Sequence, residues 1–144
     1  MRQRLTAFLV LLAVGSTVAG AQFAKTIHNT FPTKGVERIS IQVVDSLTVE
    51  RWAGNVILVQ TDVRLFNTTD GLFRYLTGEA GRYEVTASRE GDALNVLSAV
   101  PERKSIETSV GVLEEEIHVK VLLPEDYEGE GVGPYVLVAG EAGR

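Results

Sequence analysis

The sequence predicts an all-β, or at least β-dominated, domain with two layers around one core. Several segments alternate apolar and polar residues with the period of two that strands have, and clusters of turn-forming residues separate them. Only one short stretch has helical spacing, which is too little for the crossover helices of a parallel α/β sheet. We therefore expect a compact sandwich with one short helix, and a β-roll or solenoid-like unit is the alternative.

The N-terminal residues 1–21 have the pattern of a secretory signal peptide. Arg2 and Arg4 precede an apolar run from Leu5 to Val14, and the segment ends in the small residues Ala19-Gly20-Ala21. The uncharged run is shorter than the roughly 20 apolar residues of a membrane-spanning helix, which makes an anchor the weaker alternative. We expect cleavage after Ala21 and an extracytoplasmic protein, periplasmic, cell-surface or secreted, with no stable membrane anchor.

Cleavage would leave 144 − 21 = 123 residues, which is enough for one domain. Residues 22–37 show no periodicity and predict an extended lead-in. Residues 38–140 predict a single β-rich domain, and residues 141–144 form a polar tail.

Composition excludes several classes of function. The chain has no cysteine, which excludes thiol catalysis, Cys-based zinc sites and lipid attachment to cysteine. Its net charge is −5, and without Arg2 and Arg4 it becomes −7, with 12 basic and 19 acidic residues. Such a surface repels phosphate backbones, so we expect no nucleic-acid partner. Nothing in the sequence indicates a cofactor.

The first predicted strands follow residue 38. "RISIQVV" (38–44) alternates between two faces. The next unit, "LTVERWAGNVILVQTDV" (47–63), predicts a hairpin around Ala53-Gly54-Asn55, with Gly54 or Asn55 in the left-handed region. In that register Trp52 opposes Val56 and Val49 opposes Val59.

A short helix and further strands follow. "GLFRYLTGEAG" (71–81) predicts a helix of two turns, capped by Thr69 or Asp70 and stopped at Gly78, whose apolar side covers the neighbouring strands. "RYEVTASREGDALNVLSAV" (82–100) predicts a second hairpin. Residues 101–108 form a charged connector, "EEIHVKVLLP" (115–124) is a clearly alternating strand, and "PYVLVAG" (134–140) predicts a short last strand.

The order of these segments resembles a known family. A secretion signal, the alternating "VERISIQV", the "LTVERWAGNVILVQTDV" unit with its Trp-x-Gly turn, and "IHVKVLLPEDY" resemble the bacterial putative-adhesin domains, including the head GIN type. The likeness spans roughly Gly35 to Tyr127. It implies a β-solenoid or β-roll, an extracytoplasmic location and a role in surface attachment. This chain lacks the internal repeats that a solenoid needs to bury its core, which favours the compact sandwich.

Trp52 is the one candidate binding residue. A tryptophan at a recognition surface stacks on a sugar ring or a partner side chain. Alternatively it packs over Val56, Leu58 and the covering helix, because tryptophan contributes a large apolar area to a small core. We favour the packing role.

Metal sites are the weaker candidates. His28 and His118 are the only histidines, and they would need Glu115 or Glu116 beside them to hold a metal. The acidic runs 114–116 and 125–130 could bind calcium, but neither has the residue order of a known calcium loop. Solvent-exposed faces explain these residues better, so we predict no metal.

The sequence therefore predicts a secreted, non-enzymatic, adhesin-like domain that acts in surface attachment or envelope assembly, with an envelope protein or a surface glycan as partner. The alternative is a periplasmic accessory protein that binds an envelope partner by strand addition, for which the apolar segment "GPYVLVAG" (133–140) is a candidate. A small secreted hydrolase comes third, because paired carboxylates are not recognisable from sequence spacing.

Overall fold

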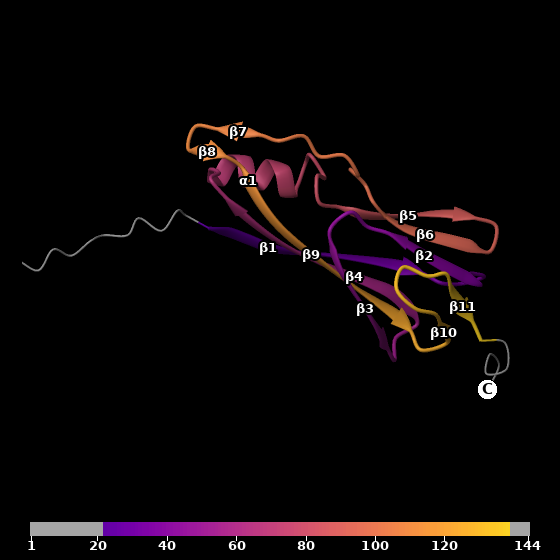
Figure 1. Cartoon of the computed structure of the whole chain (residues 1–144). Coiled ribbons are helices and arrows are strands. Elements are labelled where there is room, and N and C mark those ends of the chain that lie inside the picture. The colour runs from indigo at the N-terminus through magenta and orange to yellow at the C-terminus, as the bar shows by residue number, and fades with distance from the viewer. Residues whose placement is uncertain (1–21, 139–144) are drawn as a thin grey trace, which may run out of the picture.

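The computed structural model describes residues 22–138, so the predicted signal peptide (1–21) and polar tail (141–144) lie outside the described residues. The described chain is β-dominated and forms a two-layer sandwich (Figure 1). A four-stranded sheet, sheet A, has the order β1 (Phe23–Pro32), β4 (Val56–Phe66), β9 (Glu114–Pro124), β3 (Ser46–Trp52). A five-stranded sheet, sheet B, has the order β10 (Tyr127–Glu128), β11 (Tyr135–Leu137), β2 (Arg38–Gln42), β6 (Ala93–Ser98), β5 (Val85–Glu90). These features confirm the predicted fold class.

The predicted hairpin between the third and fourth strands is wrong. β9 lies between them: it pairs with β3 in parallel and with β4 in antiparallel orientation. Trp52 therefore lies opposite Pro124, and Val49 and Val59 both lie opposite Val121. The segment Ala53-Gly54-Asn55 therefore crosses over the end of β9. It spans two inter-strand spacings, roughly 10 Å, instead of the single spacing that a hairpin turn would span. Neither Gly54 nor Asn55 is among the residues with positive φ.

The predicted lead-in is also different in the structure. Most of it forms β1, which pairs with β4 over ten residue positions at one edge of sheet A. Phe23, Ile27 and Phe31 point toward the core, but Lys25 and Asn29 occupy the positions between them. These two polar residues hide the alternation that would have revealed a strand.

The second hairpin and the helix are confirmed. β5 and β6 pair in antiparallel orientation, with a turn at Gly91-Asp92. Helix α1 (Asp70–Thr77) begins after Thr69, whose side chain accepts a hydrogen bond from the N–H of Leu72, and it ends at Gly78. No helix in residues 22–138 is long and apolar enough to cross a membrane.

Helix α1 covers the neighbouring strand β4, as predicted, but not on the face that carries Trp52. The helix packs on the core side of sheet A at one end of the molecule, near the short hairpin of β7 (Glu107–Thr108) and β8 (Gly111–Val112) (Figure 1). Phe73 and Leu76 belong to the same buried cluster as Val63 and Leu65 of β4. No helix within residues 22–138 therefore covers the opposite face of β4, which holds Val56 and Leu58.

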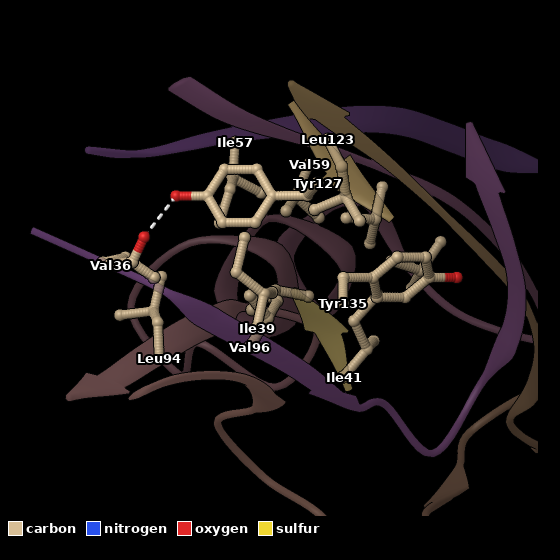
Figure 2. Packing of buried hydrophobic residues seen from close by; sticks show 13 residues of the cluster. Val36, Ile39, Ile41, Ile57, Val59, Leu94, Val96, Leu123, Tyr127 and Tyr135 are labelled. Atoms are coloured by element: carbon tan, nitrogen blue, oxygen red, sulfur yellow. Dashed lines mark hydrogen bonds between the residues drawn. The ribbon is translucent and has the colours of Figure 1, made fainter. Parts of the chain in front are cut away.

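The main core lies between the two sheets. Figure 2 shows Ile57, Val59 and Leu123 of sheet A facing Ile39 and Val96 of sheet B. Two tyrosines of the C-terminal segment close this core, and burial raises the pKa of each hydroxyl. The Tyr127 hydroxyl donates to the carbonyl of Val36 at 2.6 Å, which satisfies its polar atom inside the core (Figure 2).

Candidate recognition surface

The side of sheet A that faces away from sheet B is a sheet face that no described element covers. Along β4 and β9 alternate side chains are buried, and those between them point outward. The outward set, called the outer face below, comprises Ala24, Thr26, His28 and Thr30 of β1; Val56, Leu58, Gln60, Asp62 and Arg64 of β4; Glu116, His118, Lys120 and Leu122 of β9; and Ser46, Thr48, Glu50 and Trp52 of β3. It is polar at one end and more apolar toward Trp52.

Hydrogen bonds between strands order the polar part of the outer face. Thr26 donates from Oγ1 to Asp62 Oδ1 at 2.7 Å. The His118 ring bonds to two hydroxyls of β3, Ser46 Oγ at 3.2 Å and Thr48 Oγ1 at 2.9 Å. Cross-strand pairs of this kind fix rotamers, so the polar groups are presented in a defined arrangement.

Two further pairs of side chains join neighbouring strands on the outer face. His28 Nε2 and Gln60 Nε2 lie 3.3 Å apart, within hydrogen-bond distance. Lys120 forms a 3.2 Å ion pair with Glu50 of β3. Both members of this pair are substantially exposed, so its contribution to stability is small and its role is to order the face.

The two histidines that the sequence singled out lie on the same outer face, in adjacent rows with β4 between them. The structure separates the two candidate partner carboxylates: Glu116 points outward, whereas Glu115 lies on the core side and binds Arg82. In residues 22–138 no three His, Cys, Asp or Glu side chains gather as a ligand set for a metal.

A shallow hollow lies at the polar end of the outer face, where β3 begins and β9 extends beyond it. Its volume is about 540 Å³, and its lining includes Ser46, Asp62, Arg64, Glu116 and His118. The hollow offers both donors and acceptors and both signs of charge. It therefore suits a polar ligand better than an apolar one.

Trp52 has a structural role in the crossing from β3 to β4. Its indole Nε1 donates to the carbonyl of Val56 at 2.9 Å. The ring packs against Gly54, since a Cβ at that glycine would lie 2.2 Å from Cζ2. The predicted packing of Trp52 against the helix is wrong, because α1 lies on the other side of the sheet. The ring is half-buried and borders the apolar end of the outer face.

A largely buried ionic cluster supports the polar end from the core side. Arg82 binds Glu115 with two nitrogens, at 2.7 and 3.3 Å, and Arg103 binds both oxygens of Asp45, at 2.6 and 2.8 Å. Arg103 also donates to the carbonyl of Arg82 at 3.1 Å, which joins the two pairs. The cluster ties the charged connector to the rest of the sandwich.

Tyr83 lies inside this cluster. The guanidinium of Arg103 lies 5.1 Å from the centre of its ring, within range of a cation–π interaction. The Tyr83 hydroxyl is buried and lies near Glu115 without meeting hydrogen-bond geometry with any described group. Burial, followed by the neighbouring carboxylate, raises the pKa of this hydroxyl strongly, so it stays protonated.

The pKa values of the Arg82–Glu115 pair reflect their contact. Burial, the largest single influence on Glu115, raises the pKa of the carboxyl, but the hydrogen bonds from Arg82, the neighbouring Tyr83 hydroxyl and the charges of Arg82 and Arg103 together outweigh it and hold the pKa below its usual value. The same contact raises the pKa of Arg82. Both groups are therefore charged at neutral pH.

The C-terminal segment completes the sandwich. β11 pairs with both β2 and β10, and Tyr135 is buried. The acidic run at 125–130 forms a turn held by Arg51, which donates to the carbonyls of Tyr127 at 2.7 Å and Gly129 at 3.3 Å. As far as residue 138, this segment therefore belongs to sheet B, where β11 has a partner strand on each side.

Sequence reasoning did not identify the outer face or the ionic cluster. The sequence shows that Gln60 and Asp62 are polar residues of an alternating strand. It does not show which side chains lie beside them, because these neighbours depend on β9 lying between β3 and β4.

Comparison of the chain with protein-family models, with curated proteins and with solved structures finds no match.

Proposed function

We propose that this protein is a secreted, non-enzymatic, adhesin-like domain that attaches to its target through the outer face of sheet A. One observation carries the proposal: an uncovered sheet face whose polar side chains are held in place by cross-strand hydrogen bonds. Binding to such a face requires little further ordering of side chains, which reduces the entropic cost of association. The signal-peptide pattern of residues 1–21 supports an extracytoplasmic location.

The chemistry of the face supports a polyhydroxylated ligand such as a surface glycan. Hydroxyl, amide, imidazole and carboxylate groups alternate along neighbouring strands, as in Thr48, Gln60, His118 and Asp62. They supply donors and acceptors at the roughly 5 Å spacing of paired strands. Trp52 and the neighbouring leucines lie at one end, where the apolar side of a sugar ring can pack.

The known contacts of the carboxylates support binding over catalysis. Asp62 accepts a hydrogen bond from Thr26, and Glu115 is held by Arg82. A general acid requires a carboxyl whose pKa is raised toward neutrality, whereas the pKa of Glu115 is lowered. We therefore propose no reaction for these groups.

A double substitution tests the proposal. Gln60→Ala with His118→Ala removes two polar side chains from the outer face, and Thr86→Ala with Ser88→Ala removes two from the exposed face of sheet B as a matched control. On an array of immobilised oligosaccharides we expect the first variant to bind at least about tenfold more weakly than wild type, given about 1 kcal/mol for each lost hydrogen bond. Equal binding by the two variants, or no binding by the wild type, would contradict the proposal.

Strand addition to an envelope partner is the second candidate. The specific observation that favours it is the edge of β1, whose ten residues are paired on one side only. An exposed strand edge is a template for a further strand.

A further inference from the structure

The free edge of β1 is long and carries little charge. Between residues 23 and 32 the strand has one charged side chain, Lys25. Within the described residues no backbone group of β1 forms a hydrogen bond other than those to β4. Natural edge strands of this length are usually blunted by charges or covered, and an unblunted edge predicts pairing with another strand.

The sequence of β1 is complementary to itself in one antiparallel register. Directly opposite residues of an antiparallel pair point to the same side of a sheet, so the core positions must meet core positions. Pairing Ile27 with itself satisfies this condition and places Phe23 opposite the partner's Phe31. This register uses nine residues of each strand and leaves out Pro32, which has no N–H to donate.

The same register places an opposite charge beside Lys25, the one charged residue of β1 that would oppose pairing. Lys25 occupies a core-side position of the edge strand, a placement that normally prevents edge association. Opposite the partner's Asn29, however, it lies beside the partner's Glu84, because Asn29 Nδ2 donates to Glu84 Oε2 at 3.2 Å. By two-fold symmetry the contact occurs twice.

We infer that two copies of this chain associate through their β1 edges, in the register that places Ile27 opposite itself and Lys25 beside the partner's Glu84. The four strands of sheet A from each copy then form one continuous sheet. A two-fold axis perpendicular to the sheet leaves both outer faces on the same side, so the dimer presents two copies of the proposed binding surface. Two linked sites raise avidity for a repetitive target. The pairing itself does not depend on what the outer face binds.

Charge exchange tests this inference. Lys25→Glu places two carboxylates together at each contact and is expected to weaken the dimer at least about tenfold. Adding Glu84→Lys restores opposite charges and is expected to restore the dimer. Lys34→Glu makes the same change of charge at an exposed residue outside β1 and should leave the dimer intact. The mass of the purified protein is measured by sedimentation over a range of concentrations, with a melting curve to show that each variant is folded.

Cysteine cross-linking tests the register independently, because the chain has no native cysteine. Thr26 and His28 lie opposite each other across the inferred interface, so Thr26→Cys with His28→Cys is expected to give covalent dimers on mild oxidation. Ser46→Cys with Thr48→Cys has the same spacing on β3, the other edge of sheet A, and serves as the control.

Three results would overturn the inference. The first is a monomeric wild type at all concentrations measured. The second is a dimer that Lys25→Glu leaves unchanged or that Glu84→Lys does not rescue in a folded double variant. The third is cross-linking of the β3 control to the same extent as the β1 variant. A wild type that forms the dimer but binds no oligosaccharide would count against the proposed function alone.

Discussion

Trp52 and Gly54 together shape the crossing from β3 to β4. The indole N–H bonds to the Val56 carbonyl, and the ring occupies the space that any side chain at position 54 would need. Gly54 is therefore required for close approach and not for a left-handed backbone, since its φ is not positive. The residue that the sequence marked as a binding candidate thus has a clear structural role.

Substitutions at these two positions separate packing from recognition. Trp52→Ala is expected to lower the free energy of unfolding by about 3 kcal/mol, which is the lower end of the range for tryptophan, because the ring is only half-buried. Trp52→Phe loses the hydrogen bond to Val56 and should lower the free energy of unfolding by about 1 kcal/mol. Gly54→Ala should be destabilising because its Cβ would meet the ring. Urea unfolding measures all three, and an unchanged Trp52→Ala curve combined with lost ligand binding would reverse the assignment.

Glu115 makes stability depend on pH. Its pKa is lower in the folded chain than the ordinary value of 4.5, so folding favours the ionised form. The stabilisation is complete above the unfolded-state pKa and is lost as the pH falls through the lower folded-state pKa.

We therefore expect wild type and Glu115→Gln to differ most in free energy of unfolding at neutral pH and to converge progressively as the pH falls below 4.5 and through the folded-state pKa. Glu115→Ala leaves Arg82 largely buried without its partner and should cost about 3 to 5 kcal/mol at pH 7. Denaturant unfolding between pH 3 and pH 7 measures both, with the exposed Glu116→Gln as the control. A constant difference between wild type and Glu115→Gln across this range would contradict the assignment.

At the scale of elements, local sequence patterns were sufficient to predict those features whose structure is fixed by residues close together in the chain. The cap at Thr69, the stop at Gly78 and the β5–β6 turn were all predicted, because each is fixed by residues a few positions apart. The alternation of β9 was also predicted correctly.

Non-local pairing was beyond the reach of these signals. The insertion of β9 between β3 and β4 joins segments about 70 residues apart, as in the pair Ser46 and His118. The sequence fits either a hairpin or this arrangement, because both place Val49 and Val59 on the core side. The ionic pairs, such as Arg103 with Asp45, depend on the same long-range packing.

Removal of the last strand tests the role of the C-terminal segment. Deleting residues 135–144 removes β11 and the buried Tyr135, and it leaves β2 without one neighbour in sheet B. We expect this chain to lose its cooperative thermal transition, whereas a chain that ends at Val138 keeps every described strand. Circular dichroism and sedimentation measure the result. A stable monomer that has lost a partner would instead support strand donation by the tail.

At the scale of the whole molecule, the sandwich divides its surfaces between two tasks. The core-facing sides of both sheets, α1 and the ionic cluster supply stability. The outer face of sheet A is not needed to bury the core, and its side chains are ordered by one another. Because of this separation, side chains of the outer face can be substituted without loss of the fold. This property suits the proposed role in attachment.

The central claim is that this face meets a target outside the cell, and protease treatment of intact cells that express the tagged protein tests it most directly. We expect the tag signal to be lost from intact cells at the same protease concentration that removes it after the outer envelope has been permeabilised. Protection of the signal until permeabilisation would place the protein in an inner compartment and would contradict attachment through the outer face of sheet A.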